Sequence, residues 1–429
     1  MSQFRFARIS LMVAALGLNA MPAFVTGAHA QSKPATPAAE APKPDTVRPD
    51  LFKLLDPAMV KDLMTNKKYA EVQEKIKAAD AFADKTPYEI YVIDRMKLAL
   101  GSATSNDAMA MTALEAVINS GRMAPADQAE FVNALANYYY NQKNYPKALE
   151  WYKRYQKESA TPLKVRNAMV RAYYLSGDFA NAKAGLLPVI AEADQAHKAP
   201  DLEDLRLLAS TAAKLKDTQT YVMAMEKLVN FYPSDDFWTD LLNRMQSKPT
   251  FNNRLQLDVL RLENIALSVM APEEYTEMAE LALLAGQPAE AKKALDAGFE
   301  ANVLGTGSNG PKHKQLRDRA NKGTADDLKN IASGEANAQK SKDGLALVNL
   351  GYAYVTMGQA DKGLPMMEQG IAKGGMKRPE DSSLHLAVAY AKAGRKDDAL
   401  KVLATLKGDD GMTDLAKYWA LWLNRPTAK

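Results

Sequence analysis

The chain has 429 residues, of which 47% are hydrophobic and 25% are charged, and its formal net charge is +4 at pH 7. This composition is typical of a folded protein rather than a disordered one. The near balance of charge gives no electrostatic basis for binding nucleic acid. The lack of cysteine excludes disulfides, thiolate metal ligands and cysteine nucleophiles. Abundant Ala, Leu, Lys and Glu favour an all-helical fold.

Residues 1–30 have the pattern of a secretory signal peptide. Two arginines precede the short apolar run ISLMVAALGL, and residues 28–30, Ala-His-Ala, form a cleavage site. The apolar run is too short to span a membrane, and no later run reaches about 18 apolar residues, so we expect no integral membrane span. Residues 31–50 are rich in Pro and Ala and should form an extended linker. We therefore expect a bacterial protein exported to the periplasm, with structure beginning near Leu51.

The segment 51–233 contains a pattern that repeats. Tyr139 recurs as Tyr173 and Ala148 recurs as Ala182, in each case 34 residues later. Apolar residues follow helical spacing around both tyrosines, and a polar turn separates each tyrosine from the following small residue. One hairpin of two such helices cannot bury its own apolar face, so neighbouring hairpins must stack.

A 34-residue period of paired helices resembles the tetratricopeptide repeat (TPR) family. Leu135-Ala136 stands at that family's Leu-Gly position, whereas Val132 replaces its usual Trp. The resemblance implies an all-α fold, a right-handed superhelical solenoid of stacked helix-turn-helix repeats. It also implies an interaction scaffold whose concave groove, lined by the first helix of each repeat, holds a peptide or partner helix.

The repeat continues toward the C-terminus. Small residues recur at Ala291, Gly363 and Ala399, and glycines mark the preceding turn. The sequence predicts a degenerate repeat at 234–271, a TPR-like repeat at 272–301, and C-terminal repeats at 344–429. The last of these ends in a capping helix within MTDLAKYWALWLNRP. Between them, the polar and partly basic segment 302–343 should be an irregular, degenerate repeat of weak helices joined by mobile loops.

Three groups of residues are candidates for a dinucleotide-binding site, a metal site or an anion-binding surface. The sequence GTGSNG at 305–310 fits a dinucleotide-binding pattern, but it follows a helix rather than a strand, so we expect a loop. The histidines are too widely spaced to form a metal site, and we expect no metal, no cofactor and no catalytic residues. Basic residues between 312 and 322 could contact a phosphate-rich surface, although a solvated helix face explains them as well.

A polar and aromatic stripe on the first helices of adjacent repeats is the candidate partner-binding site. Its predicted members are Asn133, Asn137, Tyr140, Asn167, Arg171, Tyr174 and Arg206. Asn can hold a peptide backbone through its donor and its acceptor, and Arg can bind a carboxylate through two hydrogen bonds. The set resembles a partial carboxylate clamp of TPR domains, with Asn133 where such clamps carry Lys. An ordinary exposed polar face remains the alternative.

Three functions follow as hypotheses. The first is a non-enzymatic periplasmic scaffold that binds a protein or peptide partner in cell-envelope assembly or export. The second is an α-superhelical subdomain of a cell-wall enzyme. The third is a superhelix that binds lipid or polysaccharide through the basic segment.

Overall fold

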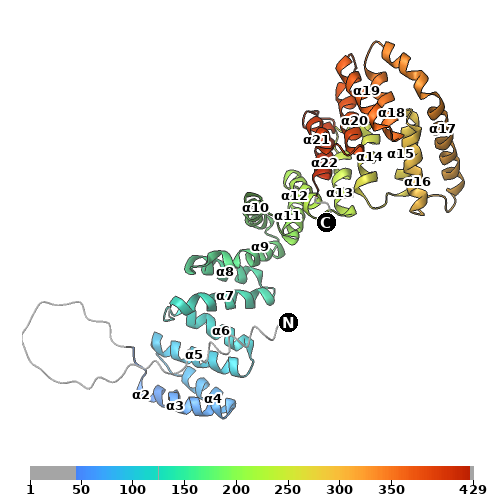
Figure 1. Cartoon of the computed structure of the whole chain (residues 1–429). Helices are drawn as coiled ribbons and strands as arrows, with labels where there is room; N and C mark the ends of the chain where they lie inside the picture. The colour runs from blue at the N-terminus through green and yellow to red at the C-terminus, as the bar shows by residue number, and fades with distance from the viewer. Residues whose placement is uncertain (1–44, 124, 426–429) are drawn as a thin grey trace, which may run out of the picture. The chain divides into compact units, whose positions relative to one another are not determined.

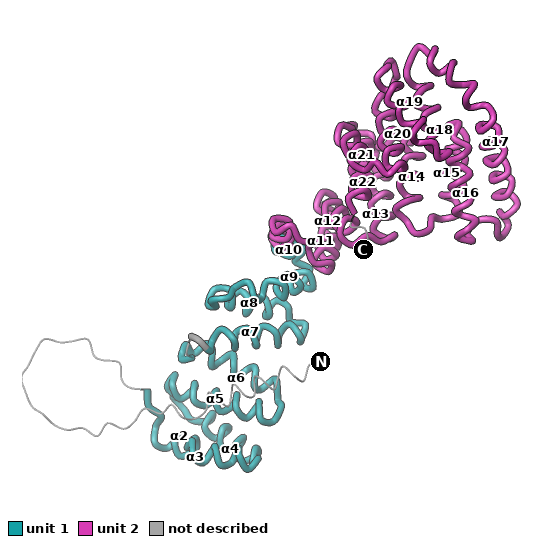
Figure 2. Tube along the Cα trace, viewed as in Figure 1, with its two compact units in different colours: residues 1–185 teal, residues 186–429 magenta. Residues whose placement is uncertain are grey.

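The computed structural model describes residues 45–123 and 125–425, and every regular element within those ranges is a helix. The predicted signal peptide and most of the predicted linker lie outside the described residues. The chain forms two compact units (Figure 2), with the boundary between residues 185 and 186. This boundary falls inside the array predicted for 51–233.

Unit 1 is a stack of consecutive helices (Figure 1). Its first helix begins at Pro49, two residues before the predicted start of structure. The helices are α2 (Pro49–Leu54), α3 (Pro57–Thr65), α4 (Tyr69–Asp80), α5 (Pro87–Ala103), α6 (Asp107–Asn119), α7 (Pro125–Asn141), α8 (Tyr145–Glu158), the short 3₁₀ helix η1 (Pro162–Val165), α9 (Arg166–Leu175) and the start of α10 (Phe179–Gln195). Antiparallel neighbours such as α5 with α6 and α7 with α8 pack closely.

The α7–α8 hairpin shows how one repeat is encoded. The side chain of Asn144 accepts a hydrogen bond from the Lys147 amide and so caps α8, while Pro146 occupies the first turn. Ala148 is completely buried, and the large side chain of Tyr152 is almost completely buried in the same core. The small residue lets the two helix backbones approach, and the tyrosine fills the space beside it, as the repeat pattern predicts.

Glycines close the helices where the sequence predicts turns. Gly177, Gly286, Gly358 and Gly394 all have positive φ angles, between 70° and 84°. In residues with a Cβ atom, that left-handed conformation is less stable by about 1–2 kcal/mol. The turn glycines therefore serve a backbone requirement, because around Gly358 no atom stands within 4 Å of where a Cβ would be.

Gly358→Ala is expected to lower the free energy of unfolding by about 1 kcal/mol through backbone strain alone. Gly334 is the matched control, because it lies inside a helix and a Cβ there would meet its nearest atom at 3.9 Å. Gly334→Ala should leave stability unchanged or raise it by up to about 1 kcal/mol. Urea unfolding of both variants tests this difference, and equal effects would contradict it.

Within residues 45–123 and 125–425, a tyrosine, a carboxylate and a cation join neighbouring repeats at three places. In each set the tyrosine hydroxyl donates to a carboxylate on the preceding helix, and a cation from its own repeat lies over the ring and near that carboxylate. The sets are Tyr139 with Glu115 and Lys147, Tyr354 with Glu335 and Lys362, and Tyr390 with Glu368 and Arg395. This recurrence places the tyrosine position of the repeat at the junction between repeats.

Unit 2 continues with helices as far as residue 424. They are α11 (Leu202–Lys214), α12 (Thr218–Phe231), α13 (Asp235–Gln246), η2 (Asn253–Leu255), α14 (Gln256–Ala266), α15 (Pro272–Leu284), α16 (Pro288–Glu300), α17 (Gly310–Lys340), α18 (Leu345–Thr356), α19 (Ala360–Lys373), α20 (Pro379–Lys392), α21 (Lys396–Leu403) and α22 (Met412–Asn424). Helix pairs appear where the degenerate repeat at 234–271 and the repeat at 272–301 were predicted.

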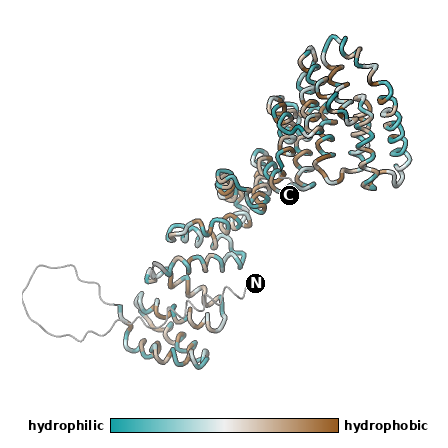
Figure 3. Tube along the Cα trace, viewed as in Figure 1, coloured by the Kyte–Doolittle hydropathy of each residue, from teal (hydrophilic) through white to brown (hydrophobic). Residues whose placement is uncertain are grey.

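The prediction for 302–343 was wrong, because one continuous helix of 31 residues, α17, fills most of that segment. Figure 3 shows α17 as largely hydrophilic. Its buried side chains His313, Leu316 and Ala320 lie on one narrow stripe, and Arg317 pairs with Asp296 of α16 at 2.7 Å. A packed stripe and two ion pairs, Arg317 with Asp296 and Glu335 with Lys362, hold a helix whose other faces are polar, so its sequence resembles that of a loop.

The helix pair α18–α19 packs through glycine. A Cβ atom on Gly363 would lie 2.3 Å from the carbonyl oxygen of Gly351, and one on Gly344 would lie 1.7 Å from that of Gly370. Gly351 of α18 and its N-cap Gly344 thus allow direct backbone contact with Gly363 and Gly370 of α19. Gly363 occupies the predicted small-residue position of its repeat.

The predicted C-terminal helix is present as α22, but its packing differs from that of a cap on an open end. It contacts α12 and α14 as well as the preceding helix α21, and Figure 1 shows it beside those early helices of unit 2. The last helix of unit 2 therefore packs against helices near the start of the same unit.

Candidate peptide-binding surface

Three predicted site residues lie on α7, one helical turn apart from one another. Asn133, Asn137 and Tyr140 are all half-buried. The Asn137 amide donates to Asn133 Oδ1 at 3.3 Å, and Asn137 Oδ1 accepts the buried Tyr152 hydroxyl at 2.7 Å. The acceptor of Asn137 is therefore used within the repeat, which the sequence did not predict. Asn137 acts as a positioning residue that holds Asn133 and Tyr152.

The next repeat supplies three more predicted residues, on α9. Asn167 and Arg171 are exposed, and Tyr174 is half-buried. Tyr174 meets Phe179 edge to face at 5.5 Å between ring centroids, just as Tyr140 meets Tyr145 at 5.6 Å. The two repeats thus present the same aromatic pair at the same position.

The positive charge of Arg171 acts on Tyr140 of the preceding repeat. Burial raises the pKa of the Tyr140 phenol, and the positive charge of Arg171 opposes that rise. No ion pair within the described residues includes Arg171. An exposed guanidinium and a half-buried phenol on neighbouring repeats are groups that can bind a carboxylate and the apolar part of the same ligand.

Arg206 belongs to unit 2, where it lies on α11. Its guanidinium pairs with Glu203 at 3.2 Å and lies 5.6 Å from the centre of the Phe237 ring. Both contacts are within unit 2, and Arg206 remains a prediction as a member of the site. The surface formed by the six predicted residues on α7 and α9 is called the α7–α9 surface below.

The sequence GTGSNG forms the loop before α17, as predicted. The Gly305 amide donates to Nδ1 of His313, so this buried histidine holds the loop in place. His197 is exposed, whereas His385 lies 3.3 Å from Asp258. No group of three or more histidines and carboxylates in the described ranges could hold a metal ion.

A buried charged network in unit 2 was not predicted. Arg261 of α14 pairs with Asp258 at 2.6 Å and with Glu290 of α16 at 2.7 Å, and all three side chains are at least 95% buried. The Tyr352 hydroxyl donates to Glu290 at 2.8 Å. Lys392 completes the network at the solvent boundary, 3.4 Å from Glu290. The only trace of it in the sequence is a pair of charges inside the otherwise apolar run LDVLRL.

The cations of this network control the ionisation of its carboxyls. Burial acts to raise the pKa of Asp258, but electrostatic interactions and hydrogen bonds with His385 and Arg261 hold it at about 2. Burial likewise opposes ionisation of Glu290, whose pKa is held at about 2 by Arg261 and Lys392. The network is therefore a set of ion pairs at neutral pH.

The pKa of Glu263, which lies on the same helix α14, is shifted in the opposite direction. Burial raises the pKa of its carboxyl to about 7, with a further contribution from Glu274 and Glu277. The folded pKa lies above the ordinary glutamate value of 4.5, so the stabilising contribution is present below pH 4.5 and is lost as the pH rises through 7.

Glu263→Gln is therefore expected to raise the free energy of unfolding by about 2–3 kcal/mol at pH 8, because the glutamine carries no buried charge. At pH 4.5 the same substitution should have little effect. The exposed Glu300 supplies a control, Glu300→Gln, which should change stability at neither pH. Urea unfolding at both values would refute this account if Glu263→Gln had the same effect at pH 4.5 and pH 8.

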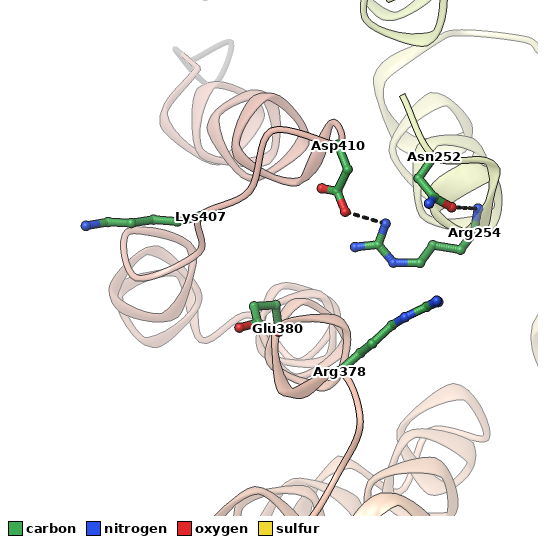
Figure 4. Close-up of a pocket in the computed structure, with 6 residues that line it drawn as sticks. All are labelled: Asn252, Arg254, Arg378, Glu380, Lys407 and Asp410. Atoms are coloured by element: carbon green, nitrogen blue, oxygen red, sulfur yellow. Dashed lines mark hydrogen bonds and ion pairs between the residues drawn. The ribbon is translucent and has the colours of Figure 1, made fainter. Parts of the chain in front are cut away.

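A cavity of about 260 Å³ is lined by polar and charged residues of unit 2 (Figure 4). It lies between η2, the start of α20 and the loop before α22. Arg254 points toward Asp410 across it, and their charged groups are 2.7 Å apart. No helix in the described ranges is both long and apolar enough to cross a membrane.

The TPR family model matches residues 110–161 and 348–411. These ranges cover most of α6, α7 and α8 in unit 1 and α18 to α21 in unit 2. The chain therefore contains tetratricopeptide repeats in both units. A comparison with curated proteins found no significant match. TPRs form protein-interaction scaffolds, and the paired helices of both units have that architecture.

Proposed function

We propose that this protein is a non-enzymatic periplasmic scaffold that binds the C-terminal part of a protein or peptide partner on the α7–α9 surface. Cell-envelope assembly or export is the process in which such a scaffold would act. The secretory pattern of residues 1–30 supports the location, and the family supports binding to a protein.

The observation that carries the proposal is the environment of Arg171. This side chain is exposed, belongs to no ion pair of the described residues, and its positive charge acts on the phenol of Tyr140 in the preceding repeat. A free terminal carboxylate would accept hydrogen bonds from the guanidinium, and the phenol rings of Tyr140 and Tyr174 would flank the last side chain. Asn133 and Asn167 would hold the ligand backbone.

The test is capture of partners from a periplasmic extract with the wild-type chain and with Arg171→Ala as bait. The control bait is Arg319→Ala, which removes an exposed arginine from α17. A partner retained by wild-type and Arg319→Ala baits but lost from the Arg171→Ala bait supports the proposal. Equal capture by all three baits contradicts it.

Exposure of the basic residues on α17 favours a second function, binding to an anionic lipid or polysaccharide. Lys312, Lys314, Arg319 and Lys322 are exposed, and no ion pair of the described residues includes them. Only Arg317 of the predicted basic group is neutralised, by Asp296. The test is sedimentation of the chain with envelope fractions. If this second function is correct, the wild-type chain sediments with them, and a variant with all four residues replaced by glutamine does not.

A further inference from the structure

Helix α22 is seated on the early helices of unit 2 by its apolar face. Its buried side chains are Met412, Leu415, Ala416, Tyr418 and Trp419. These residues follow the three-and-four spacing of one helix face. The contacts of α22 with α12 and α14 join parts of the chain that are far apart in sequence. In a regular repeat stack each helix contacts only its neighbours, so this contact is additional to the repeat architecture.

Polar contacts fix the direction and register of α22 on this surface. Lys417 pairs with Glu226 of α12 at 2.6 Å, and Asp414 pairs with Lys248 at 2.6 Å. The Trp422 indole donates to the Ile265 carbonyl at 3.0 Å. A surface with an apolar strip, a carboxylate and a cation at set positions recognises one orientation of a helix.

Two features show that α22 is an imperfect occupant. The indole Nε1 of Trp419 is buried and has no acceptor within the described residues. Leaving a buried donor unpaired opposes docking. The loop before α22 also borders the polar cavity of Figure 4, and Asp410 of that loop pairs with Arg254 there.

We propose that the α12–α14 surface is a docking site for an amphipathic helix, and that α22 occupies this site within the same chain until a partner helix replaces it. The partner helix has an aromatic and aliphatic face, a carboxylate in its first turn and a lysine three residues later. This site is in unit 2 and is independent of the α7–α9 surface.

The experiment uses a fluorescent synthetic peptide that copies residues 409–425 and the full-length chain. In the wild-type chain the tethered α22 competes with the peptide at a high effective concentration. Lys417→Glu places a carboxylate beside Glu226 and weakens docking of the chain's own helix, whereas the peptide keeps its lysine. The Lys417→Glu chain should therefore bind the peptide at least about tenfold more tightly than wild type does.

The matched control is Lys401→Glu, which reverses an exposed charge on α21 whose partner is Asp398. This chain should bind the peptide as weakly as wild type. Thermal unfolding confirms that both variants are folded. No gain of binding in the Lys417→Glu chain, or the same gain in both variants, overturns the proposal.

A second variant locates the binding site. The natural chain has no cysteine, so Lys248→Cys and Asp414→Cys can be joined specifically by a short bis-maleimide. Introduced into the Lys417→Glu chain, this cross-link ties α22 to its surface and should abolish peptide binding. If the peptide binds the cross-linked chain unchanged, it binds elsewhere, and the proposal is wrong.

Discussion

Arg261→Ala is expected to lower the free energy of unfolding by about 3–5 kcal/mol, because it leaves two buried carboxylates without their shared cation. Arg261 is 3% exposed, and its guanidinium pairs with both Asp258 and Glu290. Its position over the Tyr352 ring, 4.7 Å from the ring centre, adds a contact that alanine also removes. Urea unfolding of the variant measures the effect.

Lowering the pH should reduce the difference in free energy of unfolding between Arg261→Ala and the wild type. Asp258 and Glu290 have folded pKa values of about 2, below the ordinary values of 3.8 and 4.5 for these carboxyls. Their contribution to wild-type stability is therefore present above about pH 4.5 and is lost as the pH falls toward 2. The cost of Arg261→Ala should be largest at pH 7 and smaller at pH 3. A cost that is the same at both pH values, or no larger than that of Arg319→Ala, would show that the network contributes little.

Gly363→Leu is expected to cost about 3 kcal/mol or more, since overpacking a tight contact is destabilising and here the added atoms meet backbone. The Cβ alone would lie 2.3 Å from the Gly351 carbonyl oxygen and 2.7 Å from Val355. Neither α18 nor α19 can accommodate the side chain without moving apart. Damage in a repeat stack is local at first, so hydrogen exchange should accelerate in α18 and α19 while α5 to α8 keep their protection.

Gly334→Leu on α17 is the matched control, because its Cβ would meet only the tip of Leu350, at 3.9 Å. It should cost less than about 1 kcal/mol. Loss of protection spread evenly over both units in Gly363→Leu would argue against the repeat architecture.

Much of the fold was predictable from the sequence because a repeat pattern reports on local structure. Ala148 and Gly363 lie where the helices of a hairpin approach, and Gly177 and Gly358 lie where the turn requires a positive φ. Each of these requirements acts within one repeat. A 34-residue period therefore reveals them without knowledge of distant contacts.

The features that were missed depend on contacts between distant parts of the chain. Helix α17 packs by one stripe, so its polar sequence was mistaken for an irregular segment. The ion pair of Arg261 with Glu290 joins residues 29 positions apart, and that of Lys417 with Glu226 joins residues 191 positions apart. Neither spacing follows from the repeat.

In the candidate site, too, the sequence predicts positions that follow the repeat but not the contacts made by individual side chains. The repeat period predicts that Tyr140 and Arg171 share one face of adjacent repeats, and the positive charge of Arg171 acts on the Tyr140 phenol. The bond from the Tyr152 hydroxyl to Asn137 crosses from α8 to α7 and depends on side-chain orientation. Helical periodicity could place Asn137 on the correct face but could not show that its acceptor is already used.

The most direct test of the proposed function is a double-mutant cycle on the partner's C-terminal peptide. Its affinity is measured with a free and an amidated terminus, for wild type and for Arg171→Ala. Either change alone should weaken binding by about 1.5–3 kcal/mol, the scale of a hydrogen bond to a charged group. The two changes together should weaken it no further, because both remove the same contact. Full affinity of the amidated peptide for wild type, or losses that add, would contradict recognition of a terminal carboxylate by Arg171.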